Sequence, residues 1–123
     1  MRCKMKFTES HEWVEVKDEI GTIGITDHAQ GELGEIVYVE LPEVGRTILL
    51  GEEVVVLEST KAAADVYMPI SGEIVEVNTA LADASEMINN SPEKDGWIFK
   101  VKLSHPEEFD RLMDRETYKN FVS

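Results

Sequence analysis

The chain has 123 residues, the size of one ordinary domain, and its hydrophobic share of 42% is that of a globular protein rather than a disordered one. Twelve basic against 25 acidic residues give a formal net charge of −13. Because phosphate binding requires a basic face, this charge argues against a nucleic-acid partner. The acidity suits either solubility or attraction to basic patches on larger partners, and charge alone does not choose between them.

Neither a disulfide nor a membrane anchor is expected. Cys3 is the single cysteine, so no internal disulfide can form, and a reducing compartment such as the cytoplasm is compatible with this. The basic start at residues 1–6 lacks the apolar segment of a signal peptide. No apolar run approaches the length that spans a membrane. Nothing near Cys3, which lies close to an N-terminus expected to be frayed, indicates an activated thiol.

The first elements are expected to be a β-hairpin. Residues 13–17 alternate apolar and polar side chains, which predicts a half-buried strand. Asp18 and Glu19 follow as a turn, and residues 20–25 supply the partner strand.

A short helix is expected next. Thr26 and Asp27 are residues that cap helix N-termini, and the helix is predicted to run through Gln30. Gly31 or Gly34 would end it, because glycine readily adopts the backbone found after a helix.

Three later segments open with Gly-Glu and continue into β-branched residues, at 34–39, 51–57 and 72–77. This weak internal repeat suits a compact all-β body built of similar hairpins, such as a small sandwich or a flattened barrel. The alternative is that Gly-Glu is simply a common way to enter a strand.

The last third is expected to be mixed. Residues 79–88 contain helix formers, residues 89–92 read as a loop, and residues 96–103 read as a strand. Pro106 begins a predicted C-terminal helix, whose apolar stripe consists of Phe109, Leu112 and Met113. No linker divides the chain, so we expect one domain over residues 1–123, with its core at roughly 7–122.

Lys61 lies between two strongly β segments and is therefore expected at the tip of a hairpin, flanked by small residues. Such a lysine is accessible to a modifying enzyme and free to carry a swinging group. Most lysines in turns are merely solvated, and the pattern alone does not decide between these two interpretations. A second turn at residues 69–72 follows.

The segment ESTKAAADV at residues 58–66, followed by PISGE at 69–73, resembles the lipoyl-lysine hairpin of glycine cleavage H proteins. Further similarities to this family occur in the same order along the chain from about residue 7. They are TESHEWV at 8–14, GITDHAQ at 24–30, GEIVYVELPEVG at 34–45, IN at 88–89 and DGW at 95–97.

The resemblance implies a mainly β, lipoyl/biotinyl-domain-like flattened β-sandwich (a barrel-sandwich hybrid) with short helices and a C-terminal helix. It also implies a non-catalytic carrier with lipoate in amide linkage on Lys61. In the family, this arm takes an aminomethyl group from glycine on the glycine decarboxylase (P protein) and presents it to the aminomethyltransferase (T protein). Dihydrolipoyl dehydrogenase (L protein) then reoxidises the dithiol, and a lipoate ligase or octanoyltransferase attaches the cofactor. A monomer is expected.

Roles for four further residues are implied by the same resemblance. Ser10, Glu12 and Asp65 match positions that meet the amine of the loaded arm when it folds into a surface cleft, where exclusion of water slows its loss. Glu58 matches an acid that attachment enzymes recognise beside the lysine. The plainer interpretation of Glu12, Asp65 and Glu58 is that they are ordinary surface carboxylates.

No metal site is expected from the spacing of His11, His28 and His105, which lack the His-x-x-x-His pattern. His28 is expected to pack or hydrogen-bond at the short helix. The aromatic side chains are expected in the core; they are Trp13, Trp97 and Phe99.

Three departures from the commonest family pattern are Thr60 before the lysine, Ala64 in place of a frequent serine, and Glu93-Lys94 where an aromatic residue is common. The first two lie beside the attachment site and bear on which enzyme modifies it. The main alternative function is an H-like lipoyl relay in lipoate metabolism, with the same lysine and other partners. A biotin carrier is disfavoured because methionines do not flank Lys61, and a stand-alone enzyme is disfavoured because no nucleophile and base are paired.

Overall fold

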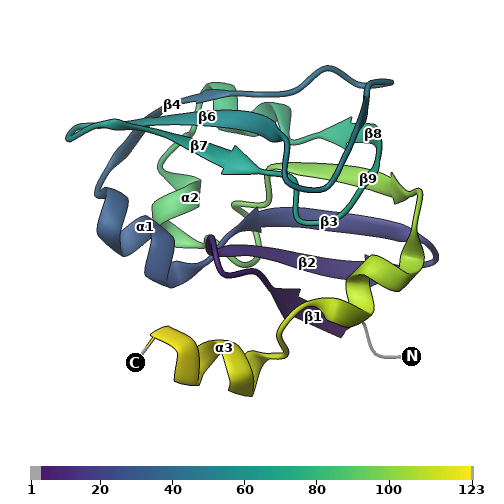
Figure 1. Cartoon of the computed structure of the whole chain (residues 1–123). Coiled ribbons are helices and arrows are strands. Elements are labelled where there is room, and N and C mark those ends of the chain that lie inside the picture. The colour runs from purple at the N-terminus through teal and green to yellow at the C-terminus, as the bar shows by residue number, and fades with distance from the viewer. Residues whose placement is uncertain (1–3, 123) are drawn as a thin grey trace.

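The computed structural model describes residues 4–122, which form two antiparallel sheets arranged as a sandwich (Figure 1). The larger sheet has the strand order β1-β2-β3-β9-β8-β5, and the smaller has the order β4-β6-β7. The strands are β1 (Lys4–Phe7), β2 (Glu12–Lys17), β3 (Ile20–Ile25), β4 (Ile36–Glu40), β5 (Thr47–Ile48), β6 (Glu53–Ser59), β7 (Ala63–Tyr67), β8 (Gly72–Val77) and β9 (Phe99–Leu103). The predicted mainly β sandwich is confirmed.

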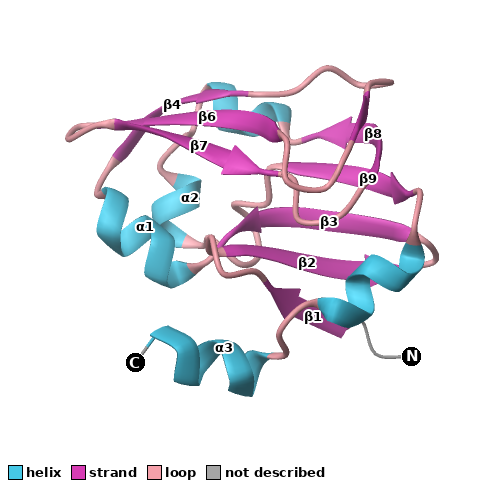
Figure 2. Cartoon of the chain, in the orientation of Figure 1, coloured by secondary structure: helices cyan, strands magenta, loops and turns pink. Residues whose placement is uncertain are grey.

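Short helices lie around the two sheets, at their ends and beside the edge strand β1 (Figure 2). They are α1 (Asp27–Leu33), α2 (Met87–Asn90), α3 (Arg115–Val122) and two 3₁₀-helices, η1 (Thr79–Ala82) and η2 (Pro106–Arg111). Helices α1 and α2 lie side by side at one end, and α3 packs near β1. None of the helices among residues 4–122 has the length and apolar character needed to cross a membrane.

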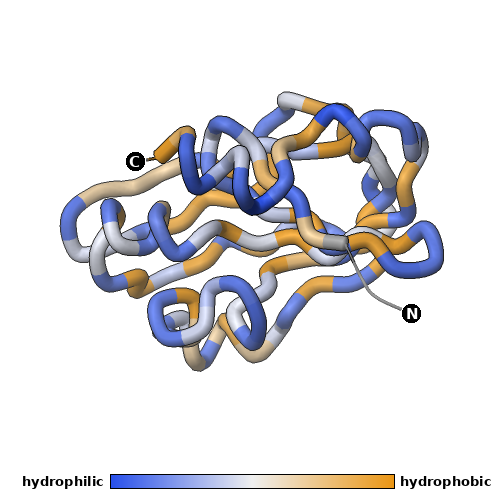
Figure 3. The backbone as a smooth tube through the Cα atoms, turned by 90° about the horizontal axis from the view of Figure 1, so that it is seen from below, coloured by the Kyte–Doolittle hydropathy of each residue, from blue (hydrophilic) through white to orange (hydrophobic). Residues whose placement is uncertain are grey.

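The main core lies between the two sheets and follows from the alternation of apolar and polar residues along the strands (Figure 3). Each sheet contributes fully buried side chains, for example Ile23, Ile74 and Phe99 from the larger and Val55 and Leu57 from the smaller. Each such side chain contributes about 1.5–3 kcal/mol by leaving water.

A second, smaller cluster joins Phe7, Trp13 and Tyr118. The rings of Phe7 and Tyr118 stack with centroids 4.8 Å apart. Tyr118 is the buried residue of α3, so this cluster attaches the C-terminal helix to the larger sheet.

The predicted hairpin of residues 13–25 is confirmed, with Lys17 opposite Ile20 and a two-residue turn between them. Asp18 and Glu19 both have positive φ, 52° and 67°, as in the turns that match the twist of antiparallel strands. The predicted short helix is also confirmed, but it continues through Gly31 to Leu33 rather than ending after Gln30. Thr26 caps α1 by accepting a hydrogen bond from the Ala29 N–H, and Gly34 ends the helix at a φ of 85°.

The single helix expected over residues 79–88 is wrong. The segment forms η1 and then α2, with turns between them, and α2 contains Asn89 and Asn90 from the predicted loop. The reason is tertiary, because the Asn89 side chain accepts from Ile36 N (2.8 Å) and donates to Gly34 O (2.8 Å). These bonds hold the segment against the end of α1 in place of a regular helix.

The continuous C-terminal helix expected from Pro106 is also wrong. Helix η2 ends at Arg111, and the backbone of the next residue, Leu112, is extended. Met113 then forms an antiparallel bridge with Phe7 through two backbone hydrogen bonds of 2.7 and 2.9 Å. Phe109 is nevertheless buried in the main core, and Leu112 packs against it. The bridge interrupts the helix, while the apolar stripe keeps its packing role.

The chain also forms two strands that the sequence patterns do not predict. Strand β1 begins at Lys4, before the expected start of the core, and all of its residues pair with residues of β2. Strand β5 has only two residues, opposite Gly72 and Glu73 of β8. Cys3 lies outside the described residues.

Candidate functional site

The segment that carries Lys61 is a tight turn between β6 and β7, which we call the hairpin tip (residues 59–63). The Ser59 Oγ accepts hydrogen bonds from the N–H groups of Lys61 and Ala62, both at 3.1 Å. The Ser59 N–H donates to Ala62 O at 2.8 Å. The Thr60 N–H donates to Glu35 O at 3.0 Å, which ties the tip to the turn before β4. The backbone is therefore fixed although its side chains are exposed.

The Lys61 side chain is exposed and lies across Gly34, where α1 ends. A Cβ added to Gly34 would stand 3.2 Å from Lys61 Cε and 3.7 Å from Nζ. Within residues 4–122, Lys61 Nζ takes part in none of the ion pairs or side-chain hydrogen bonds that the structure shows. Ala62 and Ala63, both exposed, leave the approach to the amine open. This arrangement suits a lysine that another protein must reach.

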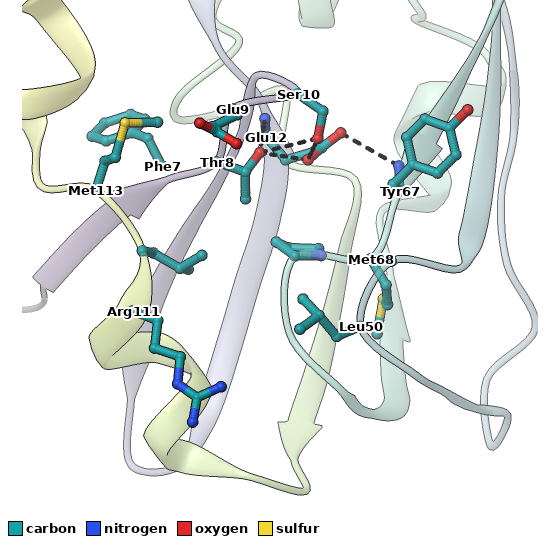
Figure 4. A pocket seen from close by; sticks show the side chains of 13 residues that line it. Phe7, Thr8, Glu9, Ser10, Glu12, Leu50, Tyr67, Met68, Arg111 and Met113 are labelled. Carbon is teal, nitrogen blue, oxygen red and sulfur yellow. Dashed lines mark hydrogen bonds between the residues drawn. The ribbon is translucent and has the colours of Figure 1, made fainter. Parts of the chain in front are cut away.

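A buried carboxylate lies at the other end of β7. Glu12 is only 2% exposed, and its Oε1 accepts hydrogen bonds from Thr8 Oγ1 and Ser10 Oγ, both at 2.6 Å (Figure 4). Its Oε2 accepts a bond of 3.3 Å from the Tyr67 N–H. We call Thr8, Ser10, Glu12 and the Tyr67 N–H the Glu12 cluster. Because Glu12 begins β2 and Tyr67 ends β7, the cluster joins the two sheets.

Two clefts meet at the Glu12 cluster. The larger has a volume of about 720 Å³ and runs from Glu12 and Tyr67 past Leu50 to Arg111 and Met113 (Figure 4). The smaller has a volume of about 140 Å³. Its walls are mostly apolar, and its polar lining includes Ser10, Glu12 and Asp65; the apolar lining residues are Ile25, Ala29, Leu33, Leu57, Ala64 and Val66.

The structure thus brings three of the sequence-predicted residues, Ser10, Glu12 and Asp65, to one small cleft. Glu58 lies apart, exposed on β6 and paired across the strands with Ala63. Sequence reasoning missed Thr8. A signal for it was present in the sequence, because two hydroxyl residues and one carboxylate occupy every second position at 8, 10 and 12. This spacing indicates that the three side chains gather at the start of a strand.

Comparison with known proteins settles the family. The model of a family described as "Glycine cleavage H-protein" matches residues 5–123. This chain belongs to the glycine cleavage H-protein family. Among curated relatives, the glycine cleavage system H protein of Rhodospirillum rubrum is 57% identical over 120 residues, covering 97% of this chain and 95% of the relative. That of Thermotoga maritima is 53% identical over 118 residues, covering 96% of this chain and 95% of the relative.

The fold agrees with a solved member of the H-protein family. The crystal structure of a glycine cleavage system H protein from Mycobacterium marinum superposes with a TM-score of 0.86 at 34% sequence identity. The match covers 98% of this chain and 97% of that chain.

The positions that depart from the commonest H-protein pattern now have structural settings. Ala64 lines the small cleft, and Thr60 is held by its backbone at the tip. Glu93 accepts from the Arg115 guanidinium at 2.8 Å and from the Asp27 N–H at 3.1 Å. Glu93, at a position where the family commonly has an aromatic residue, therefore links the start of α1 to α3.

Proposed function

We propose that Lys61 is the lysine to which lipoate is attached in this H protein. As a member of its family, the chain is a non-catalytic lipoyl carrier of the glycine cleavage system and shuttles the aminomethyl group of glycine. Its partners are the P, T and L proteins. The observation that supports Lys61 is its place on a hydrogen-bonded hairpin tip, where an exposed amine stands between small side chains.

When attached, lipoate supplies a disulfide that accepts the aminomethyl group and a dithiol that is reoxidised afterwards. The residues of this chain supply attachment and shelter. The bonds of Ser59 and Thr60 hold the tip backbone, so that presentation of Lys61 does not depend on a flexible loop.

We further propose that Ser10, Glu12 and Asp65 hold the amine of the loaded carrier at the small cleft. A protonated amine suits two carboxylates. Glu12 Oε1 already accepts two hydrogen bonds, whereas Oε2 accepts one and keeps a second lone pair for the amine. The apolar walls of the cleft exclude water, which slows loss of the amine.

Glu58 is proposed to serve recognition by the lipoate ligase or octanoyltransferase, since it is exposed near the tip and faces neither cleft. We also propose that the protein works as a single-domain monomer in the cytoplasm. The single cysteine in the sequence is compatible with that compartment.

The intact mass of the protein expressed with lipoate and a lipoate ligase tests the attachment site. The unaltered chain is expected to gain one lipoyl group, and so is Lys102→Arg, which removes another exposed lysine from β9. Lys61→Arg is expected to gain nothing while remaining folded, because the side chain is exposed at the tip. A lipoyl group on Lys61→Arg, or none on the unaltered chain beside a carrier that is modified, would reject the assignment.

A further inference from the structure

Three metal-ligating side chains from two separate segments meet beside the small cleft. His28 and Glu32 stand one turn apart on α1, with 3.4 Å between His28 Nε2 and Glu32 Oε1. His11 comes from the loop before β2, and its ring centroid is 4.7 Å from that of His28. One ligand atom from each residue lies within 4.8 Å of the other two. His11 and His28 are far apart in sequence, so the spacing of the histidines along the chain did not predict that these three side chains meet.

The His11 ring is held by a chain of hydrogen bonds through Tyr118. Its Nδ1 lies 2.8 Å from the Tyr118 hydroxyl, which lies 2.7 Å from Thr26 Oγ1. When the His11 Nδ1–H donates to Tyr118 and Tyr118 donates to Thr26, the lone pair of His11 Nε2 is free to bind a metal. Metal-ligating histidines are typically oriented in this way through their second nitrogen.

Two further features fit a cation here. His11 has a φ of 71°, a strained conformation for a residue other than glycine, and such strain gathers at functional sites. His11 and Glu32 also line the small cleft with Glu12 and Asp65, in a chain whose net charge is −13. The surrounding carboxylates therefore favour a bound cation over an anion.

We propose that His11, His28 and Glu32 form a binding site for a divalent transition-metal ion of the Zn²⁺ class. Two imidazoles and one carboxylate are a donor set that zinc accepts with one further position left open. Tetrahedral ligands at about 2.1 Å from zinc stand about 3.4 Å apart, so closure from the present arrangement requires side-chain shifts of roughly 1 Å. Glu32, whose side chain is 65% exposed, is free to make such a shift.

The test is a titration with Zn²⁺ alone, followed by calorimetry and by the imidazole proton resonances. The protein is the full chain carrying Cys3→Ser and Lys61→Arg, which removes the single cysteine and any attached dithiol. One equivalent of Zn²⁺ is expected to bind. The resonances of His11 and His28 are expected to shift, while those of the remaining histidine, His105, stay in place.

Single substitutions then locate the ligands. His28→Gln, Glu32→Gln and His11→Asn are each expected to weaken binding at least tenfold; asparagine is chosen at position 11 because it tolerates positive φ. Tyr118→Phe, which keeps the ring but removes the bond to His11, is expected to weaken it about tenfold as the loss of an outer partner. Circular dichroism verifies that each variant is folded.

The matched control is His105→Gln. His105 and Glu107 also form a histidine–carboxylate pair, 3.7 Å apart, but no second imidazole joins them in a three-ligand group among the described residues. This substitution is expected to leave Zn²⁺ affinity unchanged. Absence of saturable binding to the parent chain, or binding that survives either His28→Gln or Glu32→Gln, overturns the proposal.

Discussion

The hairpin tip and the Glu12 cluster lie at opposite ends of β7 and are built in opposite ways. At the tip, the backbone is hydrogen-bonded while the Lys61 side chain is exposed and meets no partner among the described ion pairs. At the cluster, the Glu12 side chain is buried and carries the hydrogen bonds itself. Under the proposed function, the lysine that carries the arm thus lies on a rigid backbone, and the carboxylate that meets the amine of the arm lies in a rigid side-chain network.

The largest difference between the two ends is expected in folding stability. Glu12→Ala removes the acceptor of two hydroxyls and one amide and is expected to lower the free energy of unfolding by about 2–3 kcal/mol. Glu58→Ala, at an exposed position on the neighbouring strand, is expected to change it by less than about 0.5 kcal/mol. Urea denaturation measures both, and equal effects would mean that the Glu12 hydrogen bonds contribute nothing to stability.

A smaller effect is expected at the end of α1, over which Lys61 lies. Gly34→Ala places a side chain at φ 85° and ψ −158°, a conformation almost restricted to glycine, and within 3.2 Å of Lys61 Cε, so it is expected to cost about 2 kcal/mol. Gly31 of the same helix faces open space without positive φ. Gly31→Ala is therefore expected to stabilise the protein by about 0.5–1 kcal/mol. Thermal denaturation of the Gly34→Ala and Gly31→Ala variants separates backbone strain from helix propensity. Shifts in melting temperature of the same sign for both variants would contradict this account.

The smallest effect concerns α3, which supports His11 through Tyr118. Hydrogen bonds from the backbone and side chain of Thr117 lower the pKa of Asp114 from its ordinary 3.8. A lowered pKa in the folded protein means that the ionised carboxyl adds stability above its ordinary pKa and loses it as pH falls through the folded value. The stability difference between the unaltered chain and Asp114→Asn should therefore be present at pH 7 and disappear in the acid range. A difference independent of pH would assign the effect to something other than this charge.

Local patterns predicted the parts of the fold that local interactions determine. Thr26 and Gly34 bound α1 because capping and positive φ act within a few residues. The alternation over residues 13–17, followed by the turn at Asp18 and Glu19, predicted the first hairpin for the same reason. The tip with Lys61 also followed from its flanking β segments.

The misassigned segments and the unpredicted contacts depend on residues far apart in the chain. Asn89 reads as a loop residue until its bonds to Gly34 and Ile36 are seen. The break after η2 needs the bridge from Met113 to Phe7. The contact of His11 with His28 required the loop before β2 to meet α1. None of these contacts leaves a periodic signal in the sequence.

Strand β7 also acts as a spacer of fixed length. Its five residues separate the tip from the Glu12 cluster by about 13 Å, at the usual rise along a strand. This separation changes only in discrete steps if the faces are to be preserved. Lengthening β6 and β7 by two residues each would move the tip outward by about 7 Å and leave every side chain on its original face. Lengthening each strand by one residue would instead turn Asp65 away from the small cleft. The distance between the tip and the Glu12 cluster is therefore set by the number of residues in one hairpin. If every side chain is to keep its face, each strand can change in length only by an even number of residues.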